Sequence, residues 1–134
     1  GLIEDYVGKR WNAQAYTSLG QLRYLSCMQF VDGVVGNSSS GIAEAPSMQI
    51  GTVNIGDRQQ GRLMAQSVIS SDGEYNNILA ALYKLFDAQF RKSLAHIHNP
   101  YGDGGASKKI VKILASYPLE AILKKTFYDI QTSG

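Results

Sequence analysis

The feature that most constrains the fold is a set of three short, apolar, β-branched runs, each bounded by glycine or by a turn signal. They cover residues 33–35, 51–56 and 67–70. None of them alternates apolar and polar residues, which is typical of strands covered on both faces, as in a parallel sheet. Helical patterns precede, separate and follow these runs. The sequence therefore predicts an α/β protein with a parallel sheet flanked by helices. A weaker run at residues 12–16 is a candidate edge strand.

Helices are predicted where apolar residues recur three and four positions apart. The clearest ones cover residues 20–30 and 74–90, and two more open near residues 107 and 116. The first of these helices has an apolar stripe made of Leu22, Leu25 and Met28. Three or four strands with this many helices make a thin sheet, so the chain resembles part of a larger domain.

The chain has 134 residues, 44 % of them hydrophobic, which suits one domain. Lys and Arg number 13 against 11 Asp and Glu, and the net charge of +2 predicts neither a nucleic-acid nor a membrane partner. The single cysteine, Cys27, allows no internal disulfide and is expected in the core of a cytoplasmic protein. His96 and His98 lack further ligands nearby, so neither a metal ion nor a cofactor is expected.

The segment best suited to chemistry is residues 36–46, GNSSSGIAEAP, which follows the first predicted strand. We call residues 36–41 the serine turn. Its glycines allow close approach to a phosphate, its hydroxyls can donate hydrogen bonds, and the helix that it opens presents unpaired N–H groups and partial positive charge. This pattern indicates an anion site, although the same residues also suit a plain turn and helix cap. Glu44, expected in the first helical turn, would repel a phosphate and suits ribose hydroxyls instead.

A second polar segment, residues 54–62, follows the next predicted strand. Because the carboxyl ends of adjacent parallel strands meet at one edge of a sheet, this segment and the serine turn should share one crevice. Arg58 or Arg62 could neutralise a diphosphate there, since a guanidinium matches pairs of oxygen atoms. A solvated helix start capped by Asp57 is the simpler alternative. A third segment, residues 99–107, has several glycines before a helix and is interpreted as a structural turn.

Together these segments resemble the UDP-N-acetylglucosamine 2-epimerases, and their order and spacing follow that family from about residue 19 to residue 114. The forms of the serine turn and of residues 57–62 are similar to those of the hydrolysing branch, which serves sialic-acid precursor synthesis. The resemblance implies the C-terminal half of a GT-B fold, in which two Rossmann-like domains hold the nucleotide sugar between them. The chain would then be one partial UDP-binding domain, residues 1–134, without the N-terminal catalytic domain.

The resemblance also implies roles for individual residues. Ser38 and Ser39 match serines that hold the diphosphate. Glu44 matches a residue at the ribose hydroxyls, Arg58 matches an arginine of the UDP site, and the backbone at Leu19 matches a loop that contacts uracil. A structural or supporting role is implied for Gly36, Asn37, Ser40, Gly41, Arg62, Asp103 and Gly104.

The implied reaction removes UDP from C1 and a proton from C2 of UDP-N-acetylglucosamine, after which water adds to give N-acetylmannosamine. The family's acid and base carboxylates have no counterpart here, so no catalytic residue is expected and the chain alone is predicted to be inactive. The alternatives are a non-catalytic remnant that binds UDP or a protein, and another glycosyltransferase-like GT-B domain. An incomplete sheet would expose an edge and apolar helix surface, which a homo-oligomer could hide.

Overall fold

The computed structural model of the chain describes residues 1–120 and Lys124. The chain divides into two compact units, Gly1–Asp103 and Gly104–Gly134. The first contains α1 (Leu2–Val7), α2 (Gly20–Met28), β1 (Val34–Gly36), α3 (Ser40–Ala43), the 3-10 helix η1 (Ala45–Met48), β2 (Thr52–Ile55), β3 (Val68–Ser71), α4 (Tyr75–Phe86), α5 (Ala88–Ser93) and the 3-10 helix η2 (Leu94–His96). The second contains α6 (Ala106–Ser116).

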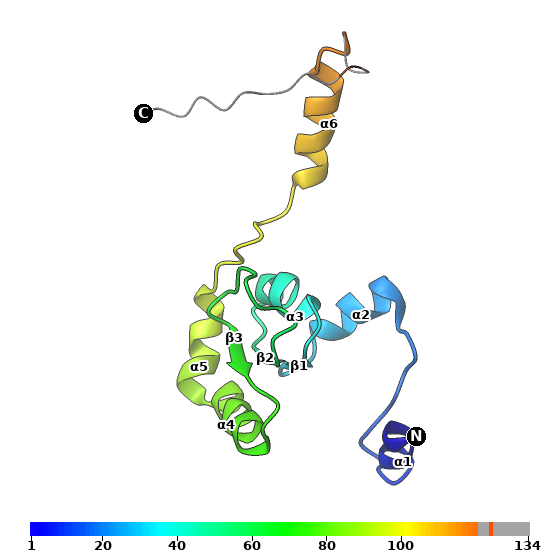
Figure 1. The fold of residues 1–134 in the computed structure, drawn as a ribbon, viewed down its shortest axis with the longest axis vertical. Helices are drawn as coiled ribbons and strands as arrows, with labels where there is room; N and C mark the ends of the chain where they lie inside the picture. Colours follow the sequence, from blue (N-terminus) through cyan, green and yellow to red (C-terminus); the bar gives the residue numbers. More distant parts are fainter. Residues whose placement is uncertain (121–123, 125–134) are drawn as a thin grey trace. The chain divides into compact units, whose positions relative to one another are not determined.

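The three predicted strands form one parallel sheet in the order β1-β2-β3 (Figure 1). The α/β class is therefore confirmed, and the arrangement is Rossmann-like. The central strand β2 is buried over its first three residues, whereas β1 and β3 are only partly buried. The expectation that all three strands are covered on both faces is wrong for the outer two. In β1, for example, Val35 remains 50 % exposed.

The two faces of β2 pack against different helices, and Figure 1 shows the strands between α3 and α4. On one face, Val53 belongs to a buried cluster with residues of β3 and α4, namely Ile69, Ala81 and Leu85. On the other face, the Thr52 hydroxyl donates a hydrogen bond of 2.9 Å to the carbonyl of Gly41 in α3. Because successive side chains of a strand point to opposite faces, this four-residue strand joins both helical layers.

The helix predicted over residues 74–90 is two helices, α4 and α5, separated at Asp87. Asp87 has an extended backbone, and its carboxylate accepts hydrogen bonds from the amides of Gln89 and Phe90, both at 2.9 Å. A side-chain cap of this kind satisfies amides that begin a helix and have no partner within it. Leu85 of α4 and Phe90 of α5 still pack in the same core. The apolar spacing therefore continues across the break, which is why it predicts a single helix.

Helix α2 forms where it is predicted but buries a different face. Met28 is buried and packs with Tyr24 and Leu25, whereas Leu22 is 82 % exposed. Cys27 is also exposed, so its expected place in the core is wrong. Adjacent helical residues differ by about 100° in direction, and that rotation carries Cys27 away from the face that Met28 occupies. Residues 12–16, the candidate edge strand, pair with no strand in the described part of the chain.

In the second unit, α6 begins at Ala106, close to the predicted start near residue 107. The helix predicted from residue 116 onwards falls largely on residues 121–134, of which only Lys124 is described. Among the described residues, no helix has the length and apolar character needed to cross a membrane.

The contact of α3 with β2 makes a testable prediction. A Cβ atom added at Gly41 would lie 2.6 Å from Cγ2 of Thr52, a β-branched side chain that has little freedom to move. Gly41→Ala should therefore lower the free energy of unfolding by about 1–3 kcal/mol, as overpacking usually does. Chemical denaturation monitored by circular dichroism measures this change.

The matched control is Gly73→Ala, because a Cβ at Gly73 meets nothing within 4 Å. Its free energy of unfolding should stay within about 0.5 kcal/mol of the unsubstituted chain. Equal losses for the two variants would show that α3 does not depend on close packing at Gly41.

Candidate functional site

The site begins where β1 and β2 end. Gly36 at the end of β1 lies opposite Asn54 in β2, and the two strands run parallel. The serine turn leaves β1 and the segment of residues 56–62 leaves β2 at the same edge of the sheet. Ligands of open α/β sheets bind at this carboxyl edge. The predicted meeting of the two polar segments is therefore confirmed at the level of the backbone.

A buried glutamine joins these two segments directly. Gln59 is only 3 % exposed, and its side-chain Nε2 donates a hydrogen bond of 2.8 Å to the backbone carbonyl of Asn37. Its Oε1 accepts a hydrogen bond of 2.8 Å from the Arg62 guanidinium. Both ends of the amide are thus used, which stabilises a polar group that would be costly to bury unpaired.

The three serine hydroxyls have different surroundings. The Ser40 hydroxyl accepts a hydrogen bond of 2.8 Å from the Tyr24 hydroxyl of α2 and lies 3.8 Å from the sulfur of Met28. The Ser38 hydroxyl accepts a long bond of 3.4 Å from the Ser40 amide. Ser39 is exposed, and its hydroxyl makes no hydrogen bond with any described residue. Ser40 therefore ties the turn to α2, while Ser38 and Ser39 face solvent.

The helix that follows the serine turn is shorter than expected. α3 has only four residues and continues as the 3-10 helix η1, so the macrodipole invoked from the sequence is small. Glu44 is the C-terminal cap of α3 and does not lie in a first helical turn, which corrects that expectation. Gly41 is buried, and its lack of a side chain permits the close contact of α3 with Thr52.

The amides of the turn are only partly used. Gly41 donates to the Ser38 carbonyl, while Ile42 and Ala43 both donate to the Ser39 carbonyl. Within the described part of the chain, the amides of Ser38 and Ser39 donate no hydrogen bond. Gly36 enters the turn with a φ of 148°, which L residues rarely adopt. Two exposed residues with unused amides thus stand at the carboxyl edge of β1.

The two arginines differ in position. Arg58 is exposed, makes no hydrogen bond or ion pair with the described residues, and directly precedes Gln59. Arg62 lines a hollow of about 750 Å³ beside the segments that follow β2 and β3, together with Asn54, Asp57, Met64 and Asp72. Neither Arg58 nor any residue of the serine turn lines this hollow. The hollow at Arg62 is therefore separate from the serine turn, and the side chain of Gln59 links the two through its hydrogen bonds with Asn37 and Arg62.

Leu19 is brought to this region through α2. It is the N-terminal cap of that helix and is half-buried, and the Tyr24 hydroxyl one turn further along reaches the serine turn. The structure thus connects Leu19 with the serine turn through α2 and the hydrogen bond between Tyr24 and Ser40.

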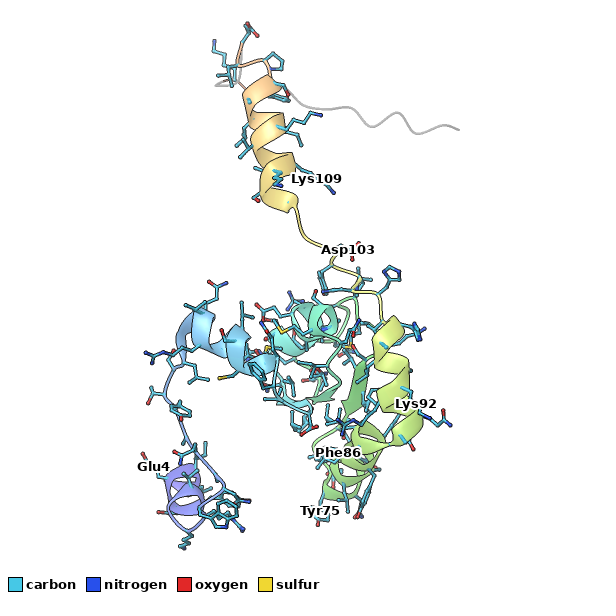
Figure 2. The ribbon with its side chains drawn as sticks, turned by 180° about the vertical axis from the view of Figure 1, so that it is seen from behind. Glu4, Tyr75, Phe86, Lys92, Asp103 and Lys109 are labelled. Atoms are coloured by element: carbon cyan, nitrogen blue, oxygen red, sulfur yellow. The ribbon has the colours of Figure 1, made fainter. Side chains whose placement is uncertain are left out.

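The third polar segment, residues 99–107, makes hydrogen bonds to the chain that follows β1 and to the chain that follows β2. The Asn99 side chain donates to the Ala43 carbonyl at 2.8 Å and to the Ser47 hydroxyl at 2.6 Å. The Tyr101 hydroxyl donates to the Leu63 carbonyl at 3.1 Å. The structural interpretation of this turn is therefore supported. Asp103, labelled in Figure 2, is exposed where the first unit ends, and Gly104 begins the second unit with a φ of 89°.

Sequence reasoning did not single out Gln59, Tyr24 or Asn99 as parts of a site. Gln59 stands among exposed polar residues, and nothing in that composition signals that one of them is buried. Tyr24 reads as one more apolar residue of an amphipathic helix. No group of three or more metal-binding side chains occurs within the described residues.

These observations define a Rossmann-like α/β domain with solvent-facing hydroxyls, unused amides and an arginine at its carboxyl edge, the edge where such domains hold nucleotides. The family model of the UDP-N-acetylglucosamine 2-epimerases matches residues 2–115. The chain belongs to this family.

Three relatives illustrate the family. A GDP/UDP-N,N'-diacetylbacillosamine 2-epimerase (hydrolyzing) of Campylobacter jejuni is 39 % identical over 131 residues, or 96 % of this chain and 34 % of the relative. Polysialic acid biosynthesis protein P7 of Escherichia coli is 35 % identical, over 93 % of this chain and 32 % of the relative. A UDP-N,N'-diacetylbacillosamine 2-epimerase (hydrolyzing) of Legionella pneumophila is 33 % identical, over 92 % and 32 %. The chain thus spans about a third of the length of these curated relatives.

The brace at Asn99 provides the test of this geometry. Asn99→Ala removes two donated hydrogen bonds and one accepted from the Tyr101 amide, and it leaves the Ala43 carbonyl without that partner. The free energy of unfolding should fall by about 1–3 kcal/mol. Amide hydrogen exchange should also quicken in α3 and η1.

Asn76→Ala is the control, because Asn76 is exposed and its side chain makes no hydrogen bond with the described residues. Its effect should stay within about 0.5 kcal/mol. Unchanged exchange in α3 after the Asn99 substitution would contradict the bracing role.

Proposed function

We propose that this chain supplies the nucleotide-binding surface of a hydrolysing UDP-sugar 2-epimerase, with UDP-N-acetylglucosamine as substrate. The observation that carries the proposal is that the serine turn and the segment after β2 lie at one edge of the sheet, where the side chain of Gln59 links them by a hydrogen bond. Membership in the family supports a UDP-sugar as the ligand of that edge. UDP-N,N'-diacetylbacillosamine is a second candidate substrate, because the Campylobacter and Legionella relatives are named as 2-epimerases of this compound.

The diphosphate would bind at the serine turn. Ser39 offers a hydroxyl, and Ser38 and Ser39 offer amides that no described residue uses. The exposed guanidinium of Arg58 is one residue from the Gln59 link and is free to turn toward this position. Charged and neutral donors converging on phosphate oxygens are the usual means of holding a diphosphate.

The same donors would assist the chemistry. Elimination breaks the bond from C1 to the diphosphate and removes the C2 proton, so negative charge grows on the departing UDP. Donors already aimed at that charge stabilise the transition state more than the ground state. Water then adds to the unsaturated sugar to give the 2-epimer and completes the reaction. The proton acceptor would belong to a part of the enzyme that this chain does not contain.

The remainder of the nucleotide would extend along the same edge. Glu44 is partly exposed at the end of α3, where a carboxylate can accept hydrogen bonds from ribose hydroxyls. The backbone at Leu19 would contact the uracil. Gly36, Asn37, Ser40 and Gly41 would shape the turn without touching the ligand.

The whole enzyme would have the GT-B arrangement, with this chain as part of its C-terminal, UDP-binding domain. A cytoplasmic location belongs to the same proposal. The chain alone would bind without turnover, which distinguishes it from a complete enzyme. A coupled assay for UDP measures this. Release of UDP from UDP-N-acetylglucosamine by the purified chain would contradict the predicted lack of turnover. A non-catalytic remnant is the competing reading, and activity of the full-length parent protein would exclude it.

Titration calorimetry with UDP tests the binding surface. Arg58→Ala should weaken UDP binding roughly tenfold, because a guanidinium–phosphate contact contributes more than a neutral hydrogen bond and the site is open to solvent. The unsubstituted chain should show saturable heat at millimolar UDP or below.

Arg10→Ala is the charge-matched control, since Arg10 is exposed, its guanidinium lies over the Tyr6 ring, and its side chain makes no hydrogen bond or ion pair with the described residues. Its affinity for UDP should be unchanged. Equal weakening by the two substitutions would indicate a general charge effect and would count against a site at Arg58.

A further inference from the structure

We propose that Gln59 is a positioning residue that aims the Ser38 amide at the diphosphate, an inference that rests on the proposed UDP site. Gln59 itself is buried and cannot touch a ligand at the surface. It acts through the backbone of the serine turn, which its side chain reaches from the neighbouring segment.

The argument starts from the geometry of one peptide group. The carbonyl of Asn37 and the N–H of Ser38 belong to the same planar unit, and in a trans peptide they point in opposite directions. The described chain contains no cis peptide bond. Because the Asn37 carbonyl points at the buried Gln59 amide, the Ser38 N–H points away from it, toward the exposed side of the turn.

The Ser38 amide is also unoccupied. It donates no hydrogen bond to any described residue, and Ser38 itself is exposed. A backbone N–H that is fixed in direction and has no internal partner is the kind of donor that phosphate oxygens use. The contact of Gln59 with the Asn37 carbonyl, at 2.8 Å, therefore holds the direction of the whole Asn37–Ser38 peptide group.

The amide of Gln59 suits the chemistry of its two neighbours. A carbonyl can only accept and an arginine can only donate, so the partner between them must donate to one and accept from the other. The Gln59 amide does both, with 2.8 Å contacts to the Asn37 carbonyl and the Arg62 guanidinium. A glutamate could serve Arg62 but would bring a second acceptor against the Asn37 carbonyl.

The test compares the affinity of the chain for UDP with its affinity for uridine, which lacks the phosphates. Each ligand is titrated into the isotope-labelled chain while the amide resonances are followed by NMR. In Gln59→Leu the Kd for UDP should rise about tenfold or more, the value of one hydrogen bond to a charged acceptor. The Kd for uridine should change by less than about twofold. If Gln59 had only a structural role, its loss would weaken the binding of UDP and of uridine alike, and that result would overturn the inference.

Two further variants make the comparison specific. Gln60→Leu is the matched control, since Gln60 is exposed and its side chain makes no hydrogen bond with the described residues, and both affinities should be unchanged. Gln59→Glu keeps an acceptor for Arg62, but it replaces the donor to Asn37 by a second acceptor and adds a negative charge. It should reproduce the loss of UDP affinity, and it carries the test if Gln59→Leu does not fold.

Failure of the proposed function would be visible separately. If the unsubstituted chain binds neither UDP nor uridine, the UDP site is contradicted, and the resonances of the Asn37–Ser38 peptide then decide the orienting role. The Asn37 carbonyl carbon and the Ser38 amide should shift in both Gln59 variants and not in Gln60→Leu. Unchanged resonances in the Gln59 variants would overturn the inference.

Discussion

The parallel pairing of β1 with β2 is the constraint on which the candidate site depends. It places Gly36 beside Asn54, so that the two polar segments that follow these strands leave the sheet at the same edge. Parallel strands need a crossover between them, and α3 with η1 provides it while covering one face of the sheet. Gly41 is where this crossover contacts β2, through a hydrogen bond and a close approach to Thr52. The packing of the fold and the position of the serine turn thus have the same cause.

Side-chain hydrogen bonds to backbone carbonyls then fix the loops at that edge. Gln59 reaches Asn37, Asn99 reaches Ala43, and Tyr101 reaches Leu63. Loops carry function best when a rigid scaffold holds them, and here each polar loop is held by a side chain from a segment distant in sequence. At the proposed diphosphate site, the Ser39 hydroxyl, the amides of Ser38 and Ser39 and the Arg58 guanidinium are not used by the described residues.

Much of the fold could be predicted from the sequence because its signals are local. The three strands, α2 and the start of α6 follow from short apolar runs and from apolar spacing. The break at Asp87 could not be predicted by spacing, since the packing of Leu85 and Phe90 preserves it. The exposure of Cys27 and Leu22 depends on which face of α2 meets η1, which is a tertiary contact.

The candidate site divides in the same way. The glycine and serine types in residues 36–41 and the arginines after β2 are visible in the sequence, and so is the parallel arrangement that brings them together. The length of α3 is not visible in the sequence. Because α3 has only four residues, Glu44 lies outside its first turn and the macrodipole is small. The burial of Gln59 is equally invisible, because a polar residue in a polar segment gives no sign that it faces inward.

A crystal structure of the chain with UDP would test the central claim most directly. We expect the two phosphates within hydrogen-bond distance, about 2.7–3.2 Å, of the Ser38 or Ser39 donors, with the Arg58 guanidinium turned toward the same oxygen atoms. Phosphates seated instead in the hollow lined by Arg62 and Asp72, or a serine turn that remains unoccupied while UDP binds elsewhere on the chain, would contradict it.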